Sequence, residues 1–251
     1  MIYGLYHSAA GMLVNEYRQD VLANNIANAD TVGFKRDVPV FSDRLNAVQS
    51  GDHDATASTA LGLLSGGIQL GRTQTDFREG GFAASDNPLD VAIEGPGFLV
   101  VRQQGKDVLT RDGRMLTDAE GVLRSAADGA EVLGEGGASI RLNPRGGDPA
   151  IDEQGRISQD GAVVARLALT DVADPLSMRK VGAGRWELPD GASTQPAAAR
   201  VFSRFTESSG VESVKELASM ITASRAYQLN AQMLSMQDQS LGRLINAVAA
   251  F

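Results

Sequence analysis

Residues 24–36 read NNIANADTVGFKR, and this stretch marks the place where an N-terminal helix has to stop. Small and amide side chains are disfavoured inside helices and common where helices end. Gly33 tolerates the left-handed backbone of a sharp turn, and Phe34 follows it as an apolar residue next to two cations. The stretch therefore predicts a helix that ends, a tight turn, and a chain that returns to packing at Phe34.

Apolar residues precede this stretch at helical spacing, in steps of four, three, four and four. They are Tyr6, Ala10, Leu13, Tyr17 and Val21. Such steps place the side chains on one helix face. Gly4 and Gly11 weaken the first turns, because glycine is a poor helix former. The pattern predicts a helix over roughly residues 3–28.

A longer helical pattern closes the chain, with alternating steps of three and four that are typical of a coiled-coil seam. The seam positions are Leu217, Met220, Ser224, Tyr227, Ala231, Leu234, Asp238, Leu241, Ile245 and Val248. One such seam returns less free energy on burial than ordering the helix backbone costs in entropy. We therefore expect the N-terminal helix to be its first partner, and both chain ends to become ordered on assembly with further chains.

The middle of the chain has the composition of short strands and turns. All eight prolines lie between Pro39 and Pro196, and Gly-containing acidic turns separate short apolar stretches. Two of these patterns, at 116–123 and 150–157, predict β-hairpins. The expected fold class is α+β, in which the N- and C-terminal helices pair as a coiled-coil-like α domain and an all-β middle domain is inserted between them.

The expected domains follow from these patterns. They are a terminal helical domain of residues 1–36 with 206–251, an extended connecting segment of residues 37–78 with 196–205, and a β-rich outer domain of residues 79–195. The connecting segment holds a stretch rich in small residues, and the sequence leaves the conformation of residues 46–72 open.

Composition argues against most chemistry. The chain has 31 acidic and 23 basic residues, a net charge of -8, whereas binders of nucleic acid or anionic membranes need clustered cations. It has no cysteine and only two histidines, His7 and His53, so thiolate chemistry and multi-histidine metal sites are not expected. We expect no catalytic residue, cofactor, metal or small-molecule substrate, and hence no enzyme.

Two alternatives of other classes remain at this point. The acidic residues of the middle domain could form a carboxylate pair acting on a cell-wall glycan, although most of them flank glycines as solvated turn residues do. The chain could also be a soluble binding module whose helices only dimerise. Neither alternative has a motif that favours it.

Targeting signals are equally sparse. The sequence has no apolar run of the roughly 18–20 residues that a membrane-spanning helix needs. Its first residues lack the basic region and the continuous apolar region of a cleaved leader. We expect no membrane insertion, and any export to occur without signal cleavage.

Several stretches, in the same order along the chain, resemble the bacterial flagellar rod and hook protein family. They are residues 24–36, 87–101, 110–113, 207–221 and 225–230. Length and the middle stretch resemble the rod proteins of the FlgF/FlgG type, with a leaning to FlgF, more than the longer hook or hook-associated proteins, which stay the alternative within the family. The approach to the last helix, residues 199–206, lacks the glycine typical of distal rod and hook members.

The resemblance implies a structural subunit of the basal-body rod, which crosses the periplasm. Such subunits are exported by the flagellar type III apparatus and polymerise through their terminal helices into an axial drive shaft around the export channel. The implied partners are other copies, related rod or hook subunits, and the export apparatus. The implied assembly residues are Leu13, Tyr17, Asn24, Asn25, Asn28, Gly33, Phe34, Leu217, Met220, Ile221, Arg225, Tyr227, Asn230, Leu234, Leu241 and Ile245.

Overall fold

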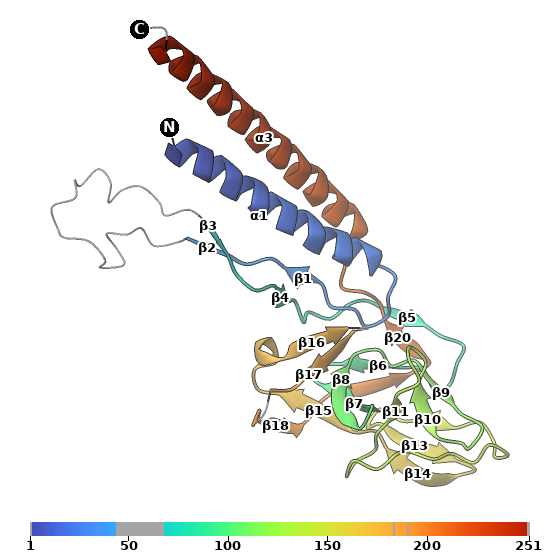
Figure 1. Ribbon diagram of the computed structural model, residues 1–251. Coiled ribbons are helices and arrows are strands. Elements are labelled where there is room, and N and C mark those ends of the chain that lie inside the picture. Colours follow the sequence, from blue (N-terminus) through green and yellow to red (C-terminus); the bar gives the residue numbers. More distant parts are fainter. Residues whose placement is uncertain (1, 44–67, 183, 190, 250–251) are drawn as a thin grey trace. The chain divides into compact units, whose positions relative to one another are not determined.

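The computed structural model describes residues 2–43, 68–182, 184–189 and 191–249, and shows two long helices with a β-rich middle (Figure 1). The expected α+β class is confirmed. The small-residue stretch around His53 lies outside the described residues. The chain divides into two compact units. The helical unit comprises residues 1–27, 37–74 and 212–251, and the β-rich unit comprises residues 28–36 and 75–211.

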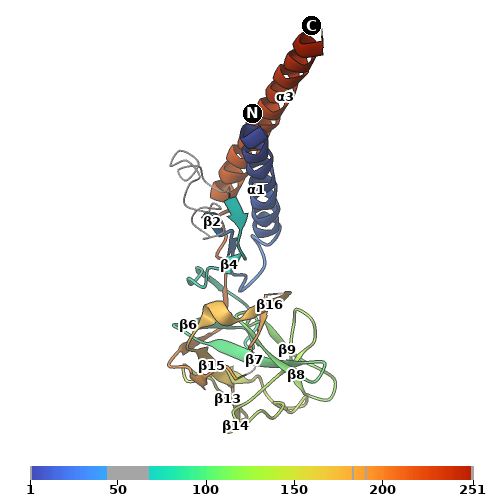
Figure 2. The same ribbon diagram turned by 60° about the vertical axis from the view of Figure 1, so that its left-hand side comes forward.

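The helical unit is built on α1 (Ile2–Ala27) and α3 (Ser213–Ala249), which run side by side in opposite directions in both views (Figures 1 and 2). The N-terminal helix expected at roughly 3–28 is confirmed. Beside the helices lie the short strands β1 (Asp37–Val38), β2 (Phe41–Asp43) and β3 (Ile68–Leu70), of which β2 and β3 pair antiparallel. Neither described helix combines the length and the apolar character that a membrane crossing requires.

The β-rich unit has one large sheet in the order β16-β17-β8-β7-β11-β10-β9, and β15 adds to it by pairing with both β7 and β18. Its strands are β7 (Phe98–Gln103), β8 (Lys106–Thr110), β9 (Met115–Thr117), β10 (Leu123–Ser125), β11 (Glu131–Val132), β15 (Leu169–Val172), β16 (Arg179–Gly182), β17 (Arg185–Glu187) and β18 (Thr194–Pro196). A single-turn helix, η1 (Pro175–Ser177), precedes β16. The pairing of β9 with β10 confirms the hairpin expected at 116–123.

Three smaller sheets complete this unit, in the pairings β12-β13-β14, β19-β6 and β20-β5. The strands are β5 (Phe82–Ala84), β6 (Val91–Glu94), β12 (Ala150–Ile151), β13 (Arg156–Gln159), β14 (Ala162–Arg166), β19 (Arg200–Ser203) and β20 (Phe205–Glu207). A further two-residue strand, β4 (Gln74–Thr75), lies where the chain passes from one unit to the other. The antiparallel pair β12-β13 confirms the hairpin expected at 150–157.

The core of the β-rich unit is apolar, and its strands β10 and β13 alternate between buried and more exposed residues, as expected for antiparallel sheets with one packed face. Val91, Ile93, Leu99 and Leu123 are almost completely buried in one aliphatic cluster. A second cluster is aromatic: the ring of Trp186 lies 5.4 Å from that of Phe77 and 5.6 Å from that of Phe98, centroid to centroid. These contacts give a chain with few aromatic residues a firm scaffold.

Candidate assembly surfaces

The contact between α1 and α3 repeats every seven residues and is unusually polar. Gly4 faces Gln237 and Gly11 faces Asn230: a Cβ atom built on either glycine would approach the facing amide nitrogen to 2.7 or 2.9 Å. Each glycine thus provides the space that a polar side chain of the other helix occupies. In both pairs the residue numbers add to 241, so the two helices are antiparallel in a single register.

Asn25 occupies the same register at the other end of the pair, opposite Glu216. Its side-chain Nδ2 donates to the backbone carbonyl of Asp37 at 2.9 Å and to Oε2 of Glu216 at 3.4 Å. Its Oδ1 accepts the backbone N–H of Asp37, also at 2.9 Å. Asn25 and Glu216 are both buried. One amide therefore joins α1, the strand β1 and α3.

This geometry corrects the seam expected for the C-terminal helix. Met220, Tyr227, Leu234 and Leu241 are half-buried as seam residues should be. The alternate positions lie one residue earlier than expected, at Glu216, Ala223, Asn230 and Gln237. Leu217 is instead 52% exposed and Asp238 is exposed. The apolar pattern misplaced this half of the seam because the glycines of α1 admit polar residues that the pattern excludes.

Large apolar side chains lie exposed on both helices. On α1 they are Tyr6 and Leu13, and on α3 they are Val214, Leu217, Ile221, Leu229, Met233, Met236, Leu244 and Ile245. Scattered exposed apolar residues are ordinary on protein surfaces, but a succession along one helix is typical of an interaction surface. We call these side chains the exposed helical residues.

A buried cluster of charges forms in the β-rich unit around Glu207. Its Oε1 atom lies 2.5 Å from Lys35 Nζ, and its Oε2 atom lies 3.6 Å from a terminal nitrogen of Arg111. All three side chains are at most 4% exposed. Burial lowers the pKa of Lys35 and of Arg111, and the carboxylate of Glu207 opposes this by favouring the charged forms.

Backbone hydrogen bonds close around the same cluster. Lys35 Nζ donates to the carbonyl of Arg78 at 2.7 Å, and Gly80 N–H donates to Oε1 of Glu207 at 3.0 Å. Gly33 N–H donates to the Glu207 carbonyl at 2.8 Å, and Gly210 N–H donates to the Phe34 carbonyl at 2.9 Å. The segments that begin and end the β-rich unit are therefore fastened to each other.

Gly33 and Phe34 behave as the turn pattern predicted. Gly33 has φ +66°, and a Cβ atom there would lie 2.5 Å from the backbone carbonyl carbon of Arg111. Phe34 is buried, and the ammonium of Lys180 lies 4.1 Å from the centre of its ring. The cation near Phe34 is thus Lys180, whereas the neighbouring Lys35 turns to Glu207.

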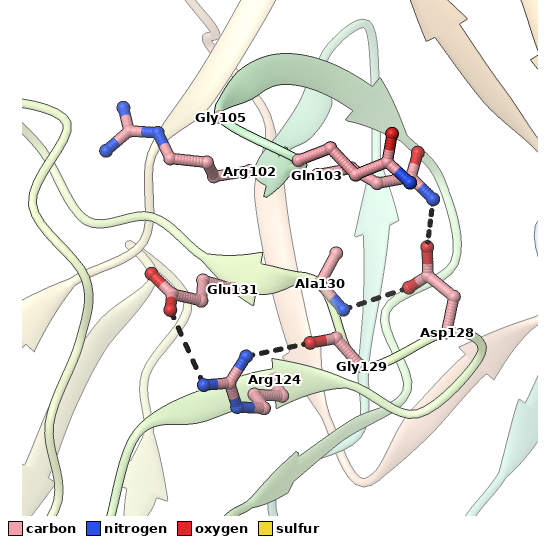
Figure 3. A pocket seen from close by; sticks show the side chains of 9 residues that line it. Arg102, Gln103, Gly105, Arg124, Asp128, Gly129, Ala130 and Glu131 are labelled. Carbon is pink, nitrogen blue, oxygen red and sulfur yellow. Dashed lines mark hydrogen bonds and ion pairs between the residues drawn. The ribbon is translucent and has the colours of Figure 1, made fainter.

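An open polar hollow of about 370 Å³ in the β-rich unit tests the carboxylate-pair alternative (Figure 3). Its lining includes Asp128 and Glu131, but Asp128 pairs with Arg185 and Glu131 with Arg124. A glycosidase needs one carboxyl group that stays protonated. Both carboxylates of the hollow are instead engaged in ion pairs with arginines, so the hollow does not support this chemistry.

Both ends of the chain match profiles of one known protein family. A family profile described as flagella basal body rod protein matches residues 5–35, and one described as flagellar basal body rod FlgEFG protein C-terminal matches residues 203–247. The flagellar basal-body rod protein FlgF of Caulobacter vibrioides is 31% identical over 232 residues, which cover 92% of this chain and 91% of the relative. The chain belongs to the flagellar basal-body rod protein family.

Other rod proteins are similar over comparable lengths. FlgG of Caulobacter vibrioides is 29% identical, with 93% of this chain and 95% of the relative covered. FlgG of Bacillus subtilis is also 29% identical, with 98% and 99% covered. The likeness thus extends to both FlgF and FlgG, and each covers nearly the whole chain.

The sixteen assembly residues expected for this rod protein fall into three groups. Asn25, Gly33 and Phe34 are buried within the chain. Tyr17, Asn28, Met220, Tyr227, Asn230, Leu234 and Leu241 are half-buried. Leu13, Asn24, Leu217, Ile221, Arg225 and Ile245 are exposed. The residues of the first group are enclosed by the chain itself, and those of the third group lie at its surface.

Sequence reasoning missed the charge cluster and the polar helix contacts. Lys35 and Glu207 lie 172 residues apart, so no local pattern connects them. The helix contacts had one signal: Gly4 and Gly11 are seven residues apart, which is a heptad. The two profile matches end at Lys35 and begin just before Glu207, so the ion pair joins the two matched segments.

Proposed function

We propose that this rod protein polymerises through its terminal helices, with copies of itself and related rod or hook subunits, into the axial drive shaft around the export channel. The exposed helical residues carry the proposal. Leucine, isoleucine and methionine side chains lie in water along one helix of the pair. Neighbouring helices that cover these side chains would lower the free energy of the assembly. Helical polymers form when such contacts are heterologous and do not close into a ring.

The proposal includes the organisation expected from the sequence. A coiled-coil-like terminal domain of residues 1–36 with 206–251 would form the inner tube, and residues 79–195 would face outward. The connecting segments, 37–78 with 196–205, would link them. The subunit would work in the rod across the periplasm, after export by the flagellar apparatus without signal cleavage. It would perform no catalysis, which the paired carboxylates of the polar hollow support.

The test replaces exposed apolar residues of α3 by charge. Leu229→Asp and Met233→Asp, combined, place two carboxylates on a surface that a neighbouring helix would cover, and desolvating them there is costly. We expect the variant to keep the secondary structure of the wild type by circular dichroism. We expect it to form no polymers by electron microscopy and to restore no swimming to cells lacking the gene.

Gln228→Asp with Gln232→Asp is the matched control, because it adds the same two charges to exposed positions of the same helix without removing an apolar side chain. It should polymerise and support swimming. A Leu229→Asp, Met233→Asp variant that polymerises as the wild type does would overturn the proposal. Electron microscopy of isolated basal bodies, with the subunit labelled, should place it in the rod.

Ordering of the chain ends is tested separately. If the ends become ordered on assembly, the helical signal at 222 nm should rise when the purified chain polymerises. Terminal segments that are already helical and protease-resistant in dilute solution would contradict that part of the proposal and leave polymerisation itself standing.

A further inference from the structure

We propose that three polar layers, Asn25–Glu216, Gly11–Asn230 and Gly4–Gln237, select the register in which α1 and α3 pair. Gly4 and Gly11 are seven residues apart, as are Asn230 and Gln237, and the layer of Asn25 and Glu216 lies fourteen residues, or two heptads, further along both helices. In each layer the two residue numbers add to 241. The inference concerns pairing within one chain, so it stands apart from polymerisation.

Apolar contacts alone leave the register open. A slip of one heptad brings equivalent faces together, because both seams repeat every seven residues. In one such slip Asn25 would move opposite Ala223, and Gln237 would move opposite Gly11. To select one register, the contact needs layers whose side chains differ from one heptad to the next.

The Asn25–Glu216 layer discriminates between registers more strongly than the two glycine layers. Its amide is fixed by two hydrogen bonds to the backbone of Asp37, so its Nδ2 atom is held toward Glu216. A slip would remove Asn25 from a buried carboxylate, and a buried charge that loses a partner is strongly disfavoured. The layer therefore favours the observed register over both one-heptad slips.

The glycine layers act through shape. Asn230 and Gln237 need a facing position without a side chain, and Gly11 and Gly4 supply it. The Oε1 atom of Gln237 is buried without a hydrogen-bond partner among the described residues. An apolar residue there would cost less, so this layer trades stability for specificity, as a single polar residue does in coiled coils.

Disulfide formation reports the register. The chain has no cysteine, so two introduced cysteines form the only possible intrachain disulfide. Ser8 and Leu234 lie midway between the layers at Gly4–Gln237 and Gly11–Asn230. Ser8→Cys with Leu234→Cys reports the observed register, and Ser8→Cys with Leu241→Cys reports the slipped one. Both pairs are oxidised in the purified chain and in isolated basal bodies, and the closed loop is read by its faster migration on a gel.

Each cysteine pair is also introduced into a second variant, the apolar background, which carries Asn230→Leu and Gln237→Met. These substitutions keep the size of the two side chains and remove their polarity. With the native layers, we expect the observed-register disulfide to dominate. In the apolar background we expect the slipped disulfide to rise about tenfold, because only the Asn25–Glu216 layer still distinguishes the two registers. Asn25→Ala alone should raise it too, with the glycine layers untouched.

The controls keep the result decisive. Circular dichroism verifies that each variant stays helical, and Asn230→Leu alone serves if the double variant misfolds. An unchanged yield of slipped disulfide in these variants would overturn the proposal. So would a slipped disulfide that already dominates with native layers, or the lack of the observed-register disulfide in both preparations.

Discussion

Lys35 and Glu207 form an ion pair of 2.5 Å in which both side chains are at most 1% exposed, although 172 residues separate them in the chain. Lys35 follows the turn after α1, and Glu207 ends β20, shortly before α3 begins. The pair thus joins the two chain segments that connect the β-rich unit to the terminal helices. Arg111 is the third member of the cluster, which therefore holds two cations and one anion.

That charge ratio predicts unequal effects of removing each partner. Glu207→Gln leaves two buried cations without their shared carboxylate, and breaking a buried pair in this way costs about 3–5 kcal/mol. Lys35→Met leaves Glu207 with Arg111, so we expect a smaller loss of about 1–2 kcal/mol. Urea unfolding of the purified chain, followed by Trp186 fluorescence, measures both, because Trp186 is buried in the same unit.

Lys106→Met is the control for this comparison, since the side chain of Lys106, which pairs with Glu187 in the same unit, is largely exposed. It should change the free energy of unfolding by less than about 1 kcal/mol. Equal losses for Glu207→Gln and Lys35→Met would contradict the view that Glu207 serves both cations.

Gly33 is expected to tolerate no side chain. Gly33→Ala places a Cβ atom 2.5 Å from the Arg111 carbonyl carbon and 2.6 Å from the Asp112 nitrogen, in a left-handed conformation with φ +66°. We expect a loss of about 3 kcal/mol, from left-handed strain and from the clash together.

Gly129→Ala separates these two causes. Gly129 has φ +73°, but a Cβ atom there meets no described atom within 4 Å. It should cost only the strain of about 1–2 kcal/mol. If urea unfolding shows the same decrease in the free energy of unfolding for Gly33→Ala and Gly129→Ala, the close approach of Gly33 to the Arg111 backbone does not contribute to the cost.

Asp76 should make the stability of the β-rich unit depend on acid pH. Hydrogen bonds from Arg78, and to a lesser extent from Arg36, hold the pKa of Asp76 well below its ordinary value of 3.8, although burial opposes them. Because the pKa is lower in the folded state, the stabilisation is complete above about pH 4 and is lost as the pH falls further. Asp76→Asn should cost roughly 1 kcal/mol at pH 7, since Arg78 is largely exposed.

The measurement is the difference in free energy of unfolding between the wild type and Asp76→Asn at pH 7, 5, 4 and 3. We expect a constant difference down to about pH 4 and a smaller one at pH 3. A difference that grows as the pH falls would have the wrong sign for a depressed pKa.

The sequence predicted those parts of the fold that depend on local patterns. Helical spacing located α1, Gly-containing turns located two hairpins, and the glycine after Val32 gave the turn before Phe34. These features depend on residues that are close together in the chain. Asn25 stays a predicted assembly residue, and the single chain buries its side chain between α1, β1 and α3.

The remaining features depend on distant pairs. No pattern reveals that Glu207 would be buried, because isolated acidic residues are usually exposed. The register of α3 was half misplaced for a related reason: an apolar pattern assigns Asn230 and Gln237 to the surface, and only the glycines on α1 make room for them. Complementarity between two helices cannot be read from either one alone.

Two glycine substitutions should therefore act in opposite directions. Gly242→Ala introduces a Cβ atom that meets no described atom within 4 Å, so it should stabilise α3 by about 0.5–1 kcal/mol through helix propensity. Gly11→Ala has the same propensity gain, but its Cβ atom would lie 2.9 Å from Asn230 Nδ2. We expect a net loss of about 1 kcal/mol, because Asn230 must leave its packed position. Combined with Asn230→Ala, Gly11→Ala should become stabilising, since the obstructing amide is gone. Thermal unfolding, followed by circular dichroism at 222 nm, measures the stability of Gly242→Ala, Gly11→Ala, Asn230→Ala and the variant that combines the last two. If Gly11→Ala changes the stability equally with and without the Asn230 side chain, the two residues do not interact.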